Sequence, residues 1–376
     1  MDITDPVHPR QTAFLTSLAM GNPWESLRVN QARGLLVADS TGKQYLDVYD
    51  VSQDCAHPRL LFSGNMPTAI GHEGAFSPDG TVYYMSCLCA SGIWPIDLTN
   101  PAKPREMAHF GNVGTIHGLW TSDDGNRAYL CETSPTDGVE IIDTSQVQGH
   151  HANPQDLIIS TAPLPDNAVC QSTYPVSYGR HRYVVQYGEQ PNAHCPSSTI
   201  TSYSTPHIVD IANEKQPFIV SDLLLQVDQP SNCPLVIGDN EPRDVAFLPA
   251  LGAGGALFGY DVHHCSPDRL HNPTLLACAY FLGGMRVFDI RDPKAPKELA
   301  YYNMGDIREP AGFVPQVDDA ISRPVILADR GLVIWTSEWS GIHLAAFENS
   351  VFPFPGYVTC PIGNDYFFAQ YNPGCK

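Results

Sequence analysis

An apolar run that closes on a single acidic residue and is followed by a turn recurs along this chain. It is clearest at Asp50 (DVYD), Asp97 (IWPID), Asp143 (VEIID), Asp210 (HIVD) and Asp289 (MRVFD). The first two intervals are nearly equal, at 47 and 46 residues, and the later ones lengthen to 67 and 79 residues around insertions. Self-similarity at a period of tens of residues is typical of propellers and solenoids, so the pattern predicts a repeat architecture.

Each repeat is expected to hold four strands. A small-residue entry leads to an Asp-Gly turn (SPDG ending at Gly80, SDDG ending at Gly125), then come a β-rich strand, the acid-ended strand and an outer strand such as PREMAHF. Asp-Gly supplies the positive φ values that tight hairpins need. Four strands per repeat indicate the blade of a β-propeller.

We count six such repeats, and a seventh blade is possible in residues 147–172 or 218–240. The inner strands are expected near residues 26–39, 72–87, 117–132, 174–188, 243–281 and 309–335. The fold class is therefore all-β: a β-propeller of six four-stranded blades, closed by strands from the N- and C-termini so that no sheet edge is exposed at the seam.

The whole chain, residues 1–376, is predicted to be a single propeller domain. Residues 10–25 are expected to form the closing outer strand, residues 26–350 the blades, and residues 351–376 a proline- and aromatic-rich tail packed on the propeller. All-β closed architectures of this length commonly form one domain.

The phrase LLACAYFLGGMRVFDIRDPKAPKELAYYN at residues 275–303 resembles the LVIVD-repeat proteins, a family of bacterial extracytoplasmic β-propellers. The likeness covers most of the chain as weak repeats and is most specific over residues 264–303, where a His-Cys pair, a second cysteine and the strand-turn-strand phrase occur together. The resemblance implies the architecture and an extracytoplasmic location. It implies no particular reaction, because a fold this general hosts many functions.

The charge of the chain excludes some partners. Forty acidic residues against 21 basic ones give a formal net charge of −19, which disfavours nucleic acid and anionic membrane surfaces. No stretch approaches the roughly 18 to 20 apolar residues of a membrane helix. The amino terminus lacks the pattern of a signal peptide, so we expect that any export signal lies outside this sequence. The lack of an N-x-S/T sequon favours a bacterial source.

Eleven cysteines, none in a C-x-x-C spacing, indicate disulfides and an oxidising compartment, periplasmic or secreted. Cys265 and Cys278 flank a short excursion and are the best candidate pair. A second candidate, Cys360 with Cys375, would tie down the tail. Cys87 and Cys89 are expected to lie too close in sequence to bond each other comfortably. The odd total predicts at least one thiol that is free or pairs outside the chain.

Aligning the repeats predicts a ring of side chains at the mouth of the propeller channel. Counting eight residues back from Gly80 and Gly125 leads to His72 and His117. The less regular repeats place Ser26 or Glu25, Tyr174, Arg243 and Glu309 in the ring, with Glu73 and Glu241 beside it. Imidazoles, carboxylates, a phenol and a guanidinium that converge on one mouth are typical of a functional site.

Three interpretations of this ring remain open. In the first, His72 and His117 with Glu309 or Glu241 bind a first-row divalent metal ion that keeps an open coordination position. In the second, one histidine is a general base, and Tyr174 with Arg243 stabilises an oxyanion without metal. In the third, the ring is an ordinary polar channel lining.

Two other pairs of histidines are weaker candidates for a functional site. His263 and His264 precede Cys265, but consecutive strand residues point to opposite faces, so we expect no joint ligation. His150 and His151 are expected to be solvated. The function predicted is an extracytoplasmic propeller that binds or transforms a small molecule at the channel mouth. The alternative is a non-catalytic scaffold that presents loops to a protein or a glycan.

Overall fold

The computed structural model describes residues 1–165, 169–189, 204–229, 231–232, 259–304, 306–307, 316–337, 340–348 and 351. These residues form antiparallel β-sheets with one short helix, α1 (Ser145–Gln148). The chain divides into two compact units: unit 1 is Met1–Pro163 with Glu214–Gln216, and unit 2 is Leu164–Asn213 with Pro217–Lys376. The single domain, the closed ring and the number of blades stay predictions. No helix in the described part of the chain is long and apolar enough to cross a membrane.

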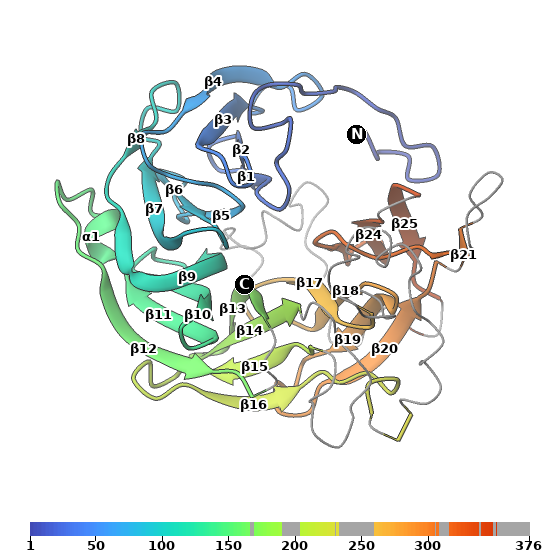
Figure 1. Ribbon diagram of the computed structural model, residues 1–376. Coiled ribbons are helices and arrows are strands. Elements are labelled where there is room, and N and C mark those ends of the chain that lie inside the picture. The colour runs from blue at the N-terminus through green and yellow to red at the C-terminus, as the bar shows by residue number, and fades with distance from the viewer. Residues whose placement is uncertain are drawn as a thin grey trace, which may run out of the picture. The chain divides into compact units, whose positions relative to one another are not determined.

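Unit 1 begins with a four-stranded antiparallel meander, seen at β1 to β4 in Figure 1. Its strands are β1 (Arg28–Asn30), β2 (Leu35–Asp39), β3 (Tyr45–Asp50) and β4 (Arg59–Asn65). The two middle strands are almost wholly buried, and the fourth contains no buried residue. Four strands in sequence order, with the last at the solvent edge, is the blade arrangement predicted from the repeats.

The next two repeats of unit 1 share one continuous sheet of eight strands. Its strands are β5 (Glu73–Phe76), β6 (Val82–Ser86), β7 (Ser91–Asp97), β8 (Arg105–Glu106), β9 (Phe110–Thr121), β10 (Arg127–Ser134), β11 (Gly138–Asp143) and β12 (Leu157–Pro163). The outer strand predicted at PREMAHF is only the two residues of β8. The long strand β9 then returns along β7, pairing Thr115 with Ser91 and Phe110 with Ile93, and so joins the two repeats (Figure 1).

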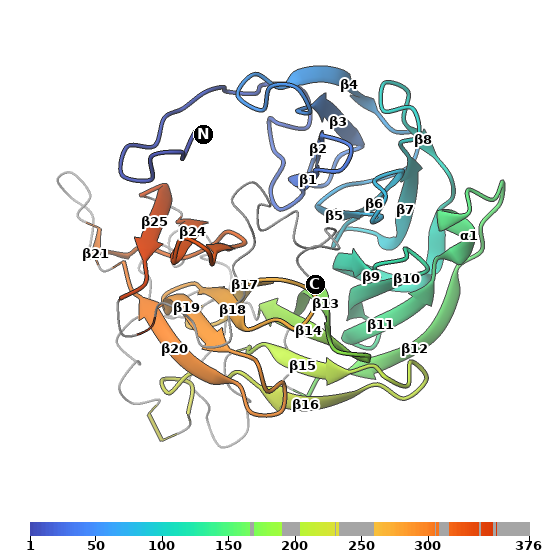
Figure 2. The same ribbon diagram turned by 180° about the vertical axis from the view of Figure 1, so that it is seen from behind.

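Unit 2 holds two further four-stranded meanders and a three-stranded sheet. The meanders, β13 to β20, are labelled in Figure 2. The meanders are β13 (Val169–Tyr178), β14 (His181–Glu189), β15 (His207–Asp210) and β16 (Phe218–Asp222), then β17 (Val262–Pro267), β18 (Leu275–Tyr280), β19 (Gly284–Asp289) and β20 (Lys297–Tyr302). A short pair, β21 (Asp306–Ile307) and β22 (Gln316–Val317), precedes β23 (Val325–Leu327), β24 (Leu332–Thr336) and β25 (Ile342–Ala346).

The recurring acids have a local structural cause. Asp50, Asp97, Asp143, Asp210 and Asp289 end β3, β7, β11, β15 and β19, the third strand of each repeat. In every case Oδ1 of the carboxylate accepts a hydrogen bond of 2.9 or 3.0 Å from the backbone N–H two residues further on. Such bonds hold the chain in a turn as it leaves a strand, which explains why the acid repeats at this position.

The predicted Asp-Gly hairpins are confirmed at both sites. Gly80 has a φ of 68° and Gly125 a φ of 71°, in the left-handed region that favours glycine. The preceding acids hold the turns closed, because Asp79 accepts from the backbone N–H of Thr81 and Asp124 from that of Asn126. These aspartates therefore serve the turns, as is common for Asp in hairpins.

The core of unit 1 lies between successive sheets. Side chains alternate along β6, so Tyr83 and Met85 pack with Val37 of the first sheet, whereas Val82 and Tyr84 pack with residues of β9 to β11. Both faces of β6 are thus covered, and all five of its residues are buried. An equivalent core in unit 2 lies between β17–β20 and β23–β25.

The segment 10–25, predicted as a closing outer strand, contains no strand. The physical reason is a competing set of hydrogen bonds. The buried Asp47 carboxylate of β3 accepts from the backbone N–H groups of Ala19 and Met20 at 2.7 and 3.0 Å, and from the hydroxyl of Ser17. The backbone donors that a ladder would use are therefore taken by a side chain, and residues 17–22 form turns.

The cysteines confirm one prediction and correct another. Cys265 and Cys278 are bonded and lie directly opposite each other in the β17–β18 ladder. Cys87 and Cys89 are also bonded to each other, with their Cα atoms 5.1 Å apart, so the expectation that they lie too close was wrong. The tight turn between β6 and β7 brings their Cα atoms within the usual range for a disulfide. Cys55 is an exposed free thiol, while Cys360 and Cys375 lie outside the described residues.

Candidate functional site

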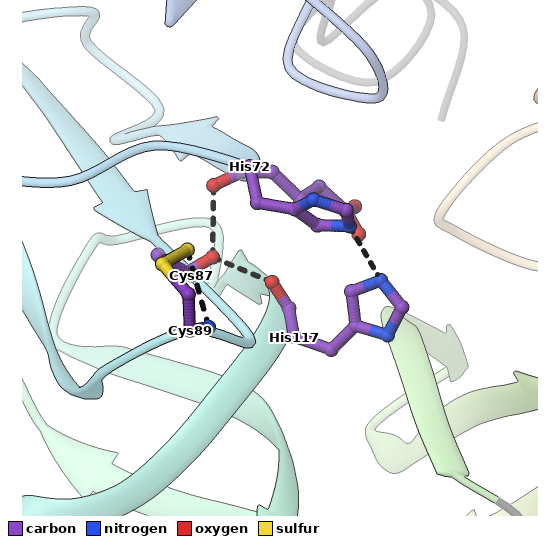
Figure 3. Close-up of a disulfide and its surroundings, with 6 residues drawn as sticks. His72, Cys87, Cys89 and His117 are labelled. Atoms are coloured by element: carbon purple, nitrogen blue, oxygen red, sulfur yellow. Dashed lines mark hydrogen bonds between the residues drawn. A yellow bond between two sulfur atoms is a disulfide. The ribbon is translucent and has the colours of Figure 1, made fainter. Parts of the chain in front are cut away.

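Two of the predicted ring residues meet in unit 1, and a third residue joins them. Nε2 of His72 lies 2.8 Å from Nε2 of His117, and their ring centroids are 4.7 Å apart (Figure 3). The Oε2 atom of Glu25 lies 3.2 Å from the His72 nitrogen and 3.3 Å from the His117 nitrogen. The three side chains are nearly buried, with exposed fractions of 9% for His72 and Glu25 and 1% for His117.

Repeat equivalence explains why these side chains converge. His72 and His117 each stand eight residues before a turn glycine of positive φ, and the same interval back from Gly34, whose φ is 61°, leads to Ser26. Glu25 precedes that serine and supplies the carboxylate. In β9 the residues His117 and Gly118 together oppose a single residue of β10, which is a β-bulge. Bulges re-aim side chains and are frequent beside active sites.

Ser86, at the end of β6, fixes the backbone around both histidines. Its hydroxyl lies 2.8 Å from the carbonyl of Glu73, the neighbour of His72, and 2.7 Å from the carbonyl of His117. The dashed lines of Figure 3 trace these contacts beside the Cys87–Cys89 disulfide. A buried hydroxyl between two carbonyls limits how far the two imidazoles can separate.

Glu25 is positioned through its neighbours. The Ser26 hydroxyl bonds the carbonyl of Asp39 at 2.7 Å and accepts from the backbone N–H of Asp39 at 2.9 Å. The guanidinium of Arg28 donates to the Glu25 carbonyl at 2.8 Å and forms an ion pair of 2.7 Å with Glu73, whose side chain is fully buried. These bonds tie the Glu25 backbone to the same elements that carry His72.

The residue before Glu25 is strained. Trp24 has a φ of 43°, in the left-handed region that bulky side chains rarely adopt, and its indole is 64% exposed. Strained backbone of this kind costs on the order of 1–3 kcal/mol and clusters at functional sites. The strain therefore marks the segment that delivers the Glu25 carboxylate.

The electrostatics of the site favour positive charge. Burial lowers the pKa of His72, but the hydrogen bond and charge of Glu25, with the charges of Glu73 and Asp39, outweigh it and raise that pKa above its usual value. For Asp39, burial acts in the opposite direction and raises the pKa to about 7, although the Tyr83 hydroxyl donates to its carboxylate at 2.8 Å. Three acids around two imidazoles make a site that attracts a cation.

The three side-chain atoms lie near the separation expected of metal ligands. Two donors at about 2.0–2.1 Å from a tetrahedral ion lie ~3.3 Å apart, close to the 3.2 and 3.3 Å measured from Glu25 and somewhat above the 2.8 Å between the imidazoles. Glu25, His72 and His117 would hold such an ion, which would supply a Lewis acid at the site. Its fourth position would remain open to a water or a small ligand.

The other predicted ring residues are distributed differently. Tyr174 is buried in β13 of unit 2, where the guanidinium of Arg323 lies 5.3 Å from its ring centroid and 3.5 Å from its hydroxyl. Arg243, Glu309 and Glu241 lie outside the described residues. The sequence-based count did not include Arg323, although this residue stands eight residues before Gly331, which has a φ of 64°.

The expectation for His263 and His264 was wrong in its geometry. Their ring centroids are 4.3 Å apart, because a β-bulge in β17 interrupts the alternation of faces between Val262 and His264. His263 also stacks on Phe281. His150, expected to be solvated, is half-buried and lies 3.0 Å from the Thr81 hydroxyl, whereas His151 is exposed.

No family model matches the chain, and no curated protein matches it either. Among solved structures it is similar to U3-55K, with 12% identity, a TM-score of 0.54, and coverage of 85% of this chain and 76% of that chain. It is also similar to a protein from Lactobacillus plantarum, with 10% identity, a TM-score of 0.58, and coverage of 89% and 83%. Identities this low show the fold alone, which is β-rich and propeller-like.

Proposed function

We propose that unit 1 binds a first-row divalent metal ion through Glu25, His72 and His117, and that a small molecule is bound or transformed at the open coordination position. The observation that carries the proposal is the triangle of ligand atoms, with sides of 2.8, 3.2 and 3.3 Å. Imidazole nitrogen with carboxylate oxygen suits zinc, copper, iron and nickel.

Two further observations support the proposal. The site is nearly buried, and the charges of Glu25, Glu73 and Asp39 raise the pKa of His72, so the surroundings of the imidazoles favour positive charge. A buried charge cluster is costly until it is compensated. A bound ion would supply that compensation, and it could also polarise a ligand carbonyl or lower the pKa of a bound water.

The protein is further proposed to work outside the cytoplasm. The disulfides Cys87–Cys89 and Cys265–Cys278 suggest an oxidising environment. The β-rich, propeller-like fold supports this proposal only as a scaffold, because residues of several repeats meet at the site.

Metal binding is tested with the full chain after removal of metal by a chelator. Titration with Zn²⁺, Cu²⁺, Co²⁺ and Ni²⁺ by calorimetry should give one site per chain, and mass spectrometry should detect the ion. His72→Ala and His117→Ala should each lower the affinity by more than the roughly 10–100-fold loss typical of changes outside the ligand shell. Glu25→Gln should weaken binding less, because an amide oxygen can still coordinate.

His57→Ala is the matched control, since His57 is exposed and contacts only Asp54 among the partners described. It should leave both affinity and melting temperature unchanged. If the wild-type protein binds none of the four ions, or if His57→Ala weakens binding as much as His72→Ala, the proposal is wrong. The His72–His117 contact is then an ordinary hydrogen bond. That outcome favours the alternative of a non-catalytic scaffold that presents loops to a protein or a glycan.

A further inference from the structure

The Cys87–Cys89 disulfide lies in the turn between β6 and β7, next to the backbone that carries the histidine pair (Figure 3). The two cysteines differ in accessibility: Cys87 is 1% exposed, whereas Cys89 is exposed. The backbone N–H of Cys89 lies 3.2 Å from the sulfur of Cys87 and donates to it. Cys89 is therefore the cysteine that solvent reaches, and the sulfur of Cys87 accepts a hydrogen bond.

The chain also contains a disulfide of the opposite kind. Cys265 and Cys278 are both 0% exposed and face each other inside the β17–β18 ladder. That bond closes a loop across 13 residues, against two for Cys87–Cys89. Because the constraint on the unfolded chain grows with loop length, the short link adds the least to stability. The strands it joins are already paired, from Ser86↔Ile93 to Val82↔Asp97.

We propose that Cys87–Cys89 is an exchange-active disulfide that accepts electrons from low-molecular-weight thiols and dithiols. A thiolate attacks the sulfur of the exposed Cys89, the Cys87–Cys89 bond breaks, and the Cys87 sulfur leaves with the electron pair, stabilised by the Cys89 N–H. A second thiolate then attacks the thiol-derived sulfur of the mixed disulfide and releases Cys89. Two thiols become one disulfide, and the protein gains two electrons and two protons.

The physical basis is general. Thiol–disulfide exchange depends on access to the attacked sulfur and on stabilisation of the leaving thiolate, and this turn supplies both. Exposed disulfides that stabilise little are the labile ones, whereas buried structural ones resist reduction. The proposal does not rest on metal binding, since neither cysteine is among the three ligands.

The test uses the full chain equilibrated in glutathione buffers of increasing reduced-to-oxidised ratio. After acid quenching, free thiols are alkylated, and peptide mass spectrometry measures each cysteine separately. Cys87 and Cys89 should become alkylated together, at a value of [GSH]²/[GSSG] on the order of 100-fold lower than that needed for Cys265 and Cys278. If both pairs open together, if Cys265–Cys278 opens first, or if Cys87–Cys89 stays closed throughout, the proposal is overturned.

Two single variants test which sulfur is attacked. Cys87→Ser leaves the exposed Cys89, which should form a mixed disulfide with oxidised glutathione. Cys89→Ser leaves the buried Cys87, which should react at least about tenfold more slowly. Equal rates, or a faster Cys87, would refute the assignment. The melting temperature of each variant is compared with that of the wild-type protein, so that loss of folding is not mistaken for altered access.

Discussion

Replacing Glu140 with Gln is expected to stabilise the protein at pH 8 and to lose most of that effect at pH 5. Glu140 lies in β11, 5% exposed, opposite Leu130 on one side and Thr161 on the other. Burial raises the pKa of its carboxyl from 4.5 to about 7, and the charge of Glu132 adds to the rise, against a hydrogen bond from Thr161. Its Oε1 atom is buried with no hydrogen-bond partner among the described residues.

The sign follows from proton linkage. The folded protein holds the Glu140 proton more tightly than the unfolded chain does. The contribution of this carboxyl to the free energy of unfolding therefore falls as the pH rises from 4.5 to about 7, and it is constant above that range. One pKa unit corresponds to about 1.4 kcal/mol, which sets an upper limit of about 3 kcal/mol. The effective dielectric constant of a protein interior, about 20, reduces this to about 1–2 kcal/mol. Gln keeps the size and removes the charge.

Urea unfolding followed by tryptophan fluorescence measures the effect at both pH values. Glu348→Gln is the control, because Glu348 is exposed and the substitution changes the net charge by the same amount. Glu140→Gln should raise the unfolding midpoint at pH 8 and shift it little at pH 5, whereas the control should do neither. An equal shift of Glu140→Gln at both pH values, or a lower midpoint at pH 8, would refute a buried carboxyl of raised pKa.

Three other substitutions probe the fold, each measured by the urea midpoint. Gly179→Ala, at a φ of 62° with open space around it, should lower the free energy of unfolding by about 1 kcal/mol. Gly80→Ala should lower it more, because the added Cβ would lie 2.6 Å from the side chain of Asn30. Equal losses would contradict this steric clash. Replacing both Cys265 and Cys278 with Ala should cost about 3 kcal/mol under non-reducing conditions, and an unchanged midpoint would contradict this. Arg28→Met removes the ion pair of the fully buried Glu73 carboxylate and should cost about 3–5 kcal/mol. Glu73→Gln in the same chain should restore much of the loss, and no recovery would argue against the ion pair.

The repeats could be predicted because each one reuses the same local chemistry. Asp50, Asp97 and their equivalents terminate strands through bonds to a backbone N–H two residues away, and Gly80 and Gly125 close hairpins through positive φ. Both signals lie within a few residues of sequence. The pairing of β7 with β9 could not be predicted, since it depends on two strands of different repeats and no local residue marks it.

The same limit applies to the site. His72 and His117 were found because a regular interval separates each from a turn glycine, and the structure brings them together. Glu25 was considered only as an alternative to Ser26, because that repeat lacks the Asp-Gly turn that anchors the count. The paired rings of His263 and His264 depend on a β-bulge, which no composition or spacing signals.

At the metal site proposed above, the continuous sheet from β5 to β12 would influence ion selectivity. His72 precedes β5 and His117 lies in β9, so both imidazoles belong to one hydrogen-bonded framework, while Glu25 precedes β1 in a separate sheet. The two nitrogens are therefore held within one sheet, whereas the carboxylate is tied to that sheet through Arg28, which bonds Glu25 and pairs with Glu73. An ion of different radius would require the strained segment at Trp24 to move. The free-energy cost of that movement would then set the preference of the site for one ion over another.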